Sequence, residues 1–455
     1  FPDLLGLVSN YQPGGSTTTA SNAFFQSLGT NGRTCFTCHQ TPQAMGMSAV
    51  HAQAVFALTG GRDPLFAPVD GANCPNQVPA ASTSGALLGG RTGSATRTDL
   101  RAAYSQLLSK GLFRIFLPVP AQAEFTIQVV SDPNGCNTDP AYNQEVDPTT
   151  GAVIQIISIY RRPLMTSSLK FKTTHLNLPG PGFPLPEANN IMWDGREPTL
   201  ESQANDATLI HAQATTPPTS DQIAQMVTFE NGIFSAQGQL GPVSLWQGGA
   251  LGGAKYLSTQ SPLTQLSPTP NLDYFSVWNN ITATTPETEL EASIARGQAL
   301  FEDGQLFTFS IGGTAGTLRG SGCASCHDQE GGGESAAPGA QRDTGVGGQS
   351  VQSNGPAPDP SLPIFKLTCA STAPVGNDGP VVTTNDPGLA LITGKCADIG
   401  EFTVPPIRGL AARAPYFHDG SAATVLDIVN FYNQRFSIGL TDQQKQDMVN
   451  FLNAL

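Results

Sequence analysis

Apolar side chains recur at near-helical spacing after Thr285, with Leu290, Ile294 and Phe301 on one face. A Thr followed by Pro286 is typical of a helix start, because the Thr side chain caps free N–H groups and Pro suits the first helical position. This pattern predicts a helix that begins at residue 286.

The stretch 421–455 has a similar stripe formed by Val425, Val429 and Tyr432, with a break near residues 437–439, and it predicts two helices. The runs 125–130 and 153–160 are strand-like and are separated by turn-rich sequence. We expect them to form a small β-ribbon within an insertion at about residues 60–160.

The pattern C-x-x-C-H occurs twice, at Cys35, Cys38, His39 and at Cys323, Cys326, His327. In this motif two thiols attach one porphyrin and the adjacent His becomes the proximal iron ligand, so the motif predicts a covalent c-type haem. A redox dithiol does not need the His, and a zinc site needs further Cys or His ligands at matching spacing. Two covalent haems are therefore the expected cofactors.

A weak internal repeat indicates two similar domains. Residues 22–39 and 296–327 each combine a short helix with an aromatic end, a Gly-rich turn and the haem motif. We place the boundary near residue 285, after a linker-like stretch at 267–271, and read 328–362 as a long loop. The expected fold is mainly α, with cytochrome c-like domains at 1–285 and 286–455 and long loops, as 49 Gly and 36 Pro in 455 residues indicate.

The formal net charge of −13 argues against nucleic acid and anionic membrane surfaces as partners and allows a basic or neutral redox partner. No stretch is apolar enough to span a membrane. No basic-then-apolar leader precedes Phe1, so we expect a processed, periplasmic chain.

Four cysteines remain outside the haem motifs. Haem attachment to C-x-x-C-H takes place outside the cytoplasm, where disulfides persist. Of the three pairings that four cysteines allow, we favour the one within each half, with free buried thiols as the alternative. The expected bonds are Cys74–Cys136 and Cys369–Cys396.

Two further strings join the haem motifs: M-W-D-G-R at 192–196, and F-T-V-P-P-I-R-G-L at 402–410 followed by A-P-Y-F-H-D-G at 414–420. In order and rough spacing, these motifs resemble those of the bacterial di-haem cytochrome c peroxidases and the related MauG-like proteins. The resemblance covers most of residues 20–455, apart from the insertions at 60–160 and 328–400.

The resemblance implies roles for individual residues. The first haem would be the peroxide site, and Trp193 would lie between the haems as an electron relay. Tyr432 matches the sixth ligand of the second haem, with Met448 as the fallback; by its stripe alone, Tyr432 would be a core residue. Arg196 and Arg408 are candidate partners of haem propionates, or else solvated surface charges.

The sequence also departs from the family pattern. The distal acid/base Glu of the peroxidases is replaced by Gln213, whose amide cannot transfer a proton at neutral pH. His211 could take that role, although a lone His is more often structural. Thr403 and Pro405 match backbone donors of a family calcium site, but Arg162 stands at the position of its Asn ligand, which weakens the expectation of calcium.

In some peroxidases a loop residue caps the first haem, and the candidates here are Met45, Met47 and His51. The resemblance implies a di-haem peroxidase of the MauG-like branch that uses hydrogen peroxide to form high-valent iron shared between two haems. Electrons would come from a small soluble donor (a cytochrome c or cupredoxin) or from a protein or small-molecule substrate. Two alternatives stay open: a non-catalytic di-haem electron carrier, and an oxygenase-type relative acting on an organic substrate.

Overall fold

A computed structural model of the chain describes residues 1–78, 97–173, 190–261, 272–311, 318–327, 341–348, 356–375 and 379–455. Helices make up 35% and strands 18%, so the fold is mixed and the expectation of a mainly helical protein is not confirmed. The predicted linker at 267–271 and most of the predicted loop at 328–362 lie outside the described residues.

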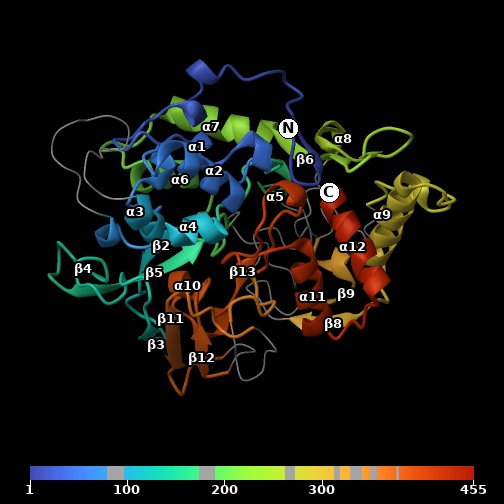
Figure 1. Cartoon of the computed structure of the whole chain (residues 1–455). Helices are drawn as coiled ribbons and strands as arrows, with labels where there is room; N and C mark the ends of the chain where they lie inside the picture. Colours follow the sequence, from blue (N-terminus) through green and yellow to red (C-terminus); the bar gives the residue numbers. More distant parts are fainter. Residues whose placement is uncertain are drawn as a thin grey trace.

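Four helices gather around the first haem motif, toward the upper left of Figure 1. Their first turns are stabilised by side-chain caps, as where Thr34, Thr199 and Thr219 each accept a hydrogen bond from the backbone N–H three residues on. The core between them contains Phe24, Met226 and other apolar residues. These helices are α1 (Cys35–Cys38), α2 (Ala49–Thr59), α6 (Leu200–Ile210) and α7 (Ser220–Gly232).

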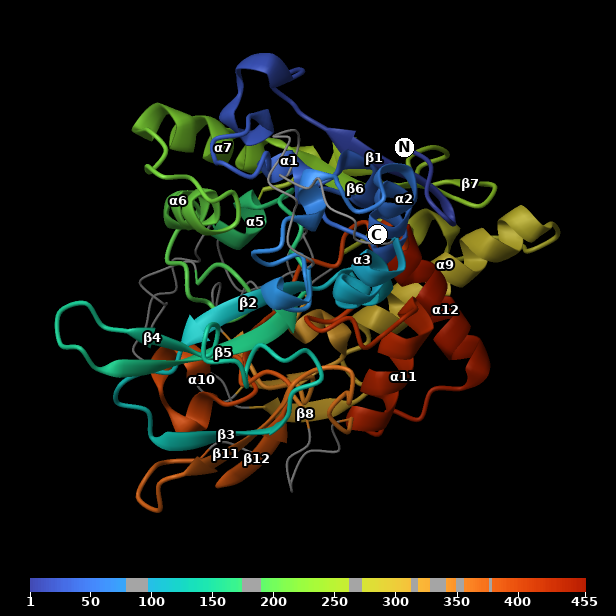
Figure 2. The ribbon, with the colours of Figure 1, turned by 60° about the vertical axis from the view of Figure 1, so that its left-hand side comes forward.

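A three-stranded antiparallel sheet lies beside this group and joins the start of the chain to its middle, in the order β1-β6-β7. The C-terminus lies against strand β6, because the N–H of Gln237 donates a hydrogen bond to the carbonyl of Leu455. The N- and C-termini consequently lie near each other in both views (Figures 1 and 2). The strands are β1 (Gly6–Tyr11), β6 (Phe234–Leu240) and β7 (Val243–Ser244). Two short helices of the first half are α5 (Lys170–Thr173) and α8 (Ala254–Thr259).

The two predicted strand runs of the insertion are confirmed as strands, but the β-ribbon they were expected to form is wrong. β3 (Phe125–Ser131) pairs with β11 (Ile364–Cys369), which pairs with β12 (Val381–Thr384), whereas β5 (Val153–Arg161) pairs with β2 (Phe113–Pro118) and β4 (Gln144–Val146). The physical reason is a shared apolar core, in which Ile157 and Ile159 pack with Phe365 and Leu367. The insertions of the two halves therefore form one structure, at the bottom of Figure 2.

The second half contains three long helices, which confirm the helices predicted after residue 285 and within 421–455. α9 (Pro286–Glu302) begins where predicted, with Thr285 as its cap, and α11 (Val425–Arg435) and α12 (Asp442–Ala454) are separated by the predicted break. Gly297 lets α9 and α12 approach closely, since a Cβ there would lie 2.0 Å from the carbonyl oxygen of Asp447. A core that includes Ile294, Phe301 and Phe451 fills the space between them.

The remaining elements are short. They are the helices α3 (Arg97–Ala103), α4 (Ser105–Lys110) and α10 (Ala390–Thr393), and the strand pairs β8 (Thr308–Ile311) with β9 (Leu318–Ser321) and β10 (Gln341–Arg342) with β13 (Phe402–Thr403). Among the helices of the described ranges, none is long and apolar enough to cross a membrane.

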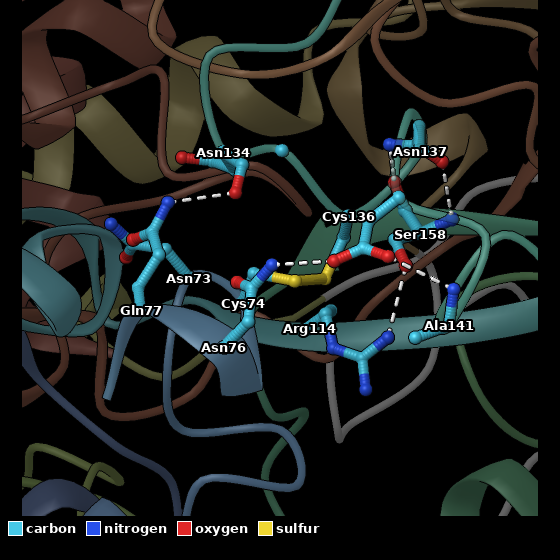
Figure 3. The surroundings of a disulfide bond; sticks show 12 residues. Asn73, Cys74, Asn76, Gln77, Arg114, Asn134, Cys136, Asn137, Ala141 and Ser158 are labelled. Carbon is cyan, nitrogen blue, oxygen red and sulfur yellow. Dashed lines mark hydrogen bonds between the residues drawn. A yellow bond between two sulfur atoms is a disulfide. The ribbon is translucent and has the colours of Figure 1, made fainter. Parts of the chain in front are cut away.

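Both predicted disulfides are confirmed, Cys74–Cys136 and Cys369–Cys396. Figure 3 shows the first bond, in a polar setting where Gln77 donates to the carbonyl of Asn134 at 2.7 Å and Asn137 bonds the backbone of Ser158. The four haem-motif cysteines form no disulfide, so each half keeps an intact pair for haem attachment.

Candidate functional site

Each haem motif opens into its own large cavity. The first cavity encloses about 1540 Å³ and is lined by Cys35, Cys38 and His39; the second encloses about 1520 Å³ and is lined by Cys323, Cys326 and His327. Both volumes include space open to solvent, and each pair of cysteines lies with its His on the wall of its own cavity. The motifs and the space beside them therefore fit one covalently attached macrocycle each.

The imidazole of His39 is held in the orientation that iron ligation requires. Its Nδ1 lies 3.2 Å from the carbonyl oxygen of Met45, which accepts a hydrogen bond and leaves Nε2 free to bind a metal. Burial lowers the pKa of His39 to about 4, which favours the neutral ring that acts as a ligand. The short helix α1 and the capping box of Thr34 with Thr37 fix this motif in place.

Trp193 lines both cavities. Its indole Nε1–H donates to the carbonyl of Arg162 at 2.7 Å, and its own carbonyl accepts from the N–H of Thr403 at 2.9 Å. On one side its ring meets that of His418 edge-on, with centroids 6.1 Å apart. The wall between the cavities is therefore a single layer of residues around this indole.

Buried ion pairs fix the backbone next to Trp193. Arg161 bonds Asp194 through one guanidinium nitrogen and Asp386 through two others, at 2.6 and 2.8 Å. Arg196 also binds Asp194, at 2.9 Å. Burial opposes ionisation of Asp194, but the two guanidinium groups hold its pKa below the usual range. Asp386 belongs to the insertion of the second half, so that insertion helps to hold the predicted relay residue.

The two candidate proton-transfer residues, His211 and Gln213, lie in different surroundings in the structure. His211 lines the first cavity, and its Nδ1 lies 2.5 Å from the carboxylate of Asp70. Gln213 is exposed, does not line that cavity, and binds Asn31 through its side-chain oxygen at 3.2 Å. Position 213 is thus turned away from the space where peroxide would bind, whereas the His two residues earlier faces it.

Asp70 was missed by the sequence analysis. It is fully buried, and Arg33 pairs with it while also donating to the backbone carbonyls of Pro64 and Leu65. Burial alone would raise the pKa of Asp70, but Arg33 and the hydrogen bond from His211 hold it below the usual range. An ionised carboxylate only accepts hydrogen bonds, so Nδ1 of His211 carries the proton and Nε2 is left to the cavity.

Tyr432 lines the second cavity with His327, as a sixth ligand of the second haem should, and Met448 lines the same cavity. Burial raises the pKa of the Tyr432 phenol to about 12. Its ring stacks on Phe436 and meets Phe417 and Phe431 edge-on. The two candidate ligands therefore lie on different helices, Tyr432 on α11 and Met448 on α12.

The candidate propionate partners also separate. Arg196 lines the first cavity but is paired with Asp194, whereas Arg408 is buried over the ring of Tyr274 and lines neither cavity. Arginines that the sequence analysis did not select line the second cavity instead: Arg342 and Arg413.

The residues expected around calcium do not suit a cation. Thr403 accepts a hydrogen bond from the ammonium group of Lys172, and Pro405 lines the second cavity. Arg162 donates to the carbonyls of Met47 and Arg413; burial, and then the Arg413 guanidinium, lower its pKa to about 9. No group of three acidic, His or Cys side chains suited to a metal ion occurs in the described ranges.

None of the three predicted caps lines the first cavity. Met45 and Met47 are fully buried in separate apolar clusters, and His51 lies on α2.

Comparisons with known proteins find similarity over part of the chain. No family model matches the chain. The chain is 32% identical over 110 residues to cytochrome-c peroxidase IdrP1 of Denitromonas iodatirespirans, which is 22% of this chain and 29% of that protein. It is 31% identical over 171 residues to hydrazine synthase subunit gamma of Kuenenia stuttgartiensis, which is 35% of this chain and 40% of that protein.

The chain thus spans less than a third of the length of the first curated relatives it matches. Among solved structures, a MauG-like protein associated with microbial copper homeostasis aligns with a TM-score of 0.35 and 15% identity, over 69% of this chain and 78% of that chain.

Proposed function

We propose that this chain is a periplasmic di-haem peroxidase of the MauG-like branch; its two haem motifs and its partial similarity to proteins named cytochrome-c peroxidase support this. Its haem domains are residues 1–285 and 286–455, the first reacting with hydrogen peroxide and the second passing electrons. The observation that carries this proposal is that Trp193 lines both cavities, each of which holds its own Cys pair and His.

His39 and His327 would hold the two irons, and the paired cysteines would anchor the macrocycles. When bound, a haem supplies an iron that can coordinate peroxide and exchange electrons with it. The protein supplies orientation: the carbonyl of Met45 fixes the ring of His39. No predicted cap lines the first cavity, which supports an open coordination position there.

His211 is the group we assign to accept a proton from bound peroxide. Asp70 holds its Nδ1–H, so Nε2 is the basic atom that faces the cavity. This pairing replaces the family Glu, since Gln213 is exposed and bonded to Asn31. Asp70 acts through His211 and is a positioning residue.

Trp193 would pass electrons between the two haems, because its indole is the one aromatic ring of the described chain that lines both cavities. Tyr432 would bind the second iron and lower its potential relative to a Met ligand. The electrons would come from a small soluble donor or from a substrate, and the net charge of −13 favours a basic or neutral donor surface.

Rapid mixing of the ferric holoprotein with stoichiometric hydrogen peroxide tests this proposal. Before mixing, we expect the EPR spectrum of the ferric holoprotein to show one high-spin and one low-spin haem. After mixing, we expect a fast change in the haem absorption spectrum. A haem spectrum that peroxide leaves unchanged would overturn the proposal and leave the electron-carrier alternative.

A further inference from the structure

One ionisable side chain of the first cavity has no role in the function described so far. Glu230, in the last turn of α7, lines this cavity together with Cys35 and Met226. Glu230 is 4% exposed, and its Oε2 has no hydrogen-bond partner. A buried carboxylate without a cation or donor is costly, so such a group persists in the neutral, protonated form.

The surroundings of Glu230 agree with a neutral acid. Burial and, to a smaller extent, the nearby carboxylate of Glu201 on α6 raise its pKa to about 8. Cys35 is the other ionisable neighbour, and it would no longer titrate as a thioether. The segment 23–25, also packed against α7, has no charged residue. The other ionisable groups that line the cavity are Arg33, Cys38, His39, Asp70, Arg161, Arg162, Lys172, Arg196 and His211.

The first cavity therefore holds two proton-transfer groups of opposite character. His211 presents a basic nitrogen because Asp70 holds its other N–H, while Glu230 presents a carboxylic acid that no described group neutralises. Pairs of titratable groups whose surroundings favour opposite protonation states are the arrangement used for coupled acid and base steps.

We propose that Glu230 is the general acid of the first cavity, donating a proton to the departing oxygen of hydrogen peroxide while His211 takes the proton of the other oxygen. Cleavage of the O–O bond takes two electrons, which the haem bound in this cavity would supply, and the departing oxygen leaves as water. Two electrons from the donor would restore the haem, and the other oxygen takes the proton held by His211 and one proton from solvent to become the second water. Glu230 regains its proton from solvent, so one peroxide, two electrons and two protons give two waters. This inference rests on the proposed peroxidase function.

The test compares the holoprotein with Glu230→Gln and with Glu201→Gln as a matched control. Gln keeps the size of Glu230 but cannot supply a proton, whereas Glu201 is exposed and lines neither of the two cavities. Infrared titration between pH 5 and 10 should show a carboxylic acid band that disappears at mildly alkaline pH. This band should be absent from Glu230→Gln and should titrate at lower pH in Glu201→Gln, because one repulsive charge is gone.

Peroxide kinetics supply the second measurement. In the parent, the rate of the first spectral change should fall as pH rises through the midpoint of the infrared titration. Glu230→Gln should react at least about 10²-fold more slowly, and its rate should no longer fall over that pH range. Glu201→Gln should react at the parental rate at neutral pH, and the fall in its rate with pH should move together with the midpoint of its infrared band. Unaltered haem spectra of the ferric variants before mixing confirm that the site is intact.

The outcomes separate the two proposals. A holoprotein inert toward peroxide overturns the peroxidase function and this inference with it. A reactive holoprotein overturns this inference alone if Glu230→Gln reacts at the parental rate with the same pH profile, or if the infrared band is absent at neutral pH.

Discussion

The indole of Trp193 and the carbonyl of Arg162 are joined by a 2.7 Å hydrogen bond, and both residues line the two cavities at once. Their chain neighbours Arg161 and Asp194 form a buried ion pair. The wall between the two cavities is therefore held in place by the fold.

Trp193→Phe should slow electron transfer between the haems at least about tenfold, which corresponds to ~1.4 kcal/mol of barrier. The ring is kept, but the hydrogen bond to Arg162 and the easily oxidised indole are lost. Flash reduction of one haem, followed by absorbance of the other, measures the rate. Trp246→Phe is the matched control, since Trp246 is 62% exposed and lines neither cavity. Transfer at the parental rate in the Trp193 variant would remove this residue from the route.

Tyr432→Phe should change the ferric spectrum of the second haem, because it deletes the phenol oxygen proposed as ligand. Tyr432→Met should raise the potential of that haem by about 0.1 V or more, within the ~0.8 V range that axial ligands set. Spectroelectrochemistry measures both effects. Met448→Leu separates the two candidates: if only this variant alters the haem spectrum, Met448 is the ligand and Tyr432 is a core residue.

Asp70→Asn should destabilise the fold by about 3–5 kcal/mol at neutral pH, because the buried guanidinium of Arg33 loses its charged partner. The folded-state pKa of Asp70 lies below its unfolded value, so its contribution is present above about pH 4 and is lost as pH falls through the folded-state pKa. Denaturant unfolding at several pH values measures the difference from the parent.

The difference between the Asp70 variant and its parent should shrink below about pH 4. Asp221→Asn, at an exposed position in α7, should change stability by no more than about 0.5 kcal/mol. A difference that stays constant down to pH 2 would show that the Asp70 carboxylate is not the stabilising species.

Removing the Cys74–Cys136 bond should cost about 2–4 kcal/mol, and slightly more than removing Cys369–Cys396. The two bonds span 62 and 27 residues, and the longer loop gains ~0.7 kcal/mol more chain entropy when it is freed. Paired Cys→Ser variants, compared by denaturant unfolding of the holoprotein, test this order. The opposite order would mean that native contacts, rather than loop length, decide the cost.

Local signals in the sequence predicted much of the fold. Thr285 and Pro286 marked the start of α9, and the cysteine contexts led to both disulfides. The partner of β3 could not be predicted, because it pairs with β11, more than 230 residues later, through ordinary strand sequences without a pairing signal. The mixed fold follows from this pairing of insertions.

The same limit applies to the cavity. The haem motifs and Trp193 were found because their residues are adjacent or belong to a recognisable string, whereas Asp70 meets His211 across 141 residues. Glu230 did leave a signal: it follows Met226 by four positions and so shares the buried face of α7. A Glu on an apolar helix face indicates a special environment, but not which cavity it enters.

The central claim is that each cavity holds one haem joined to its own cysteine pair, on either side of Trp193. Intact mass of the denatured holoprotein tests it most directly, alongside paired Cys→Ser variants at Cys35 with Cys38 and at Cys323 with Cys326. The account predicts two covalently retained haems in the parent and one in each variant. A parent mass with fewer than two haems would contradict it.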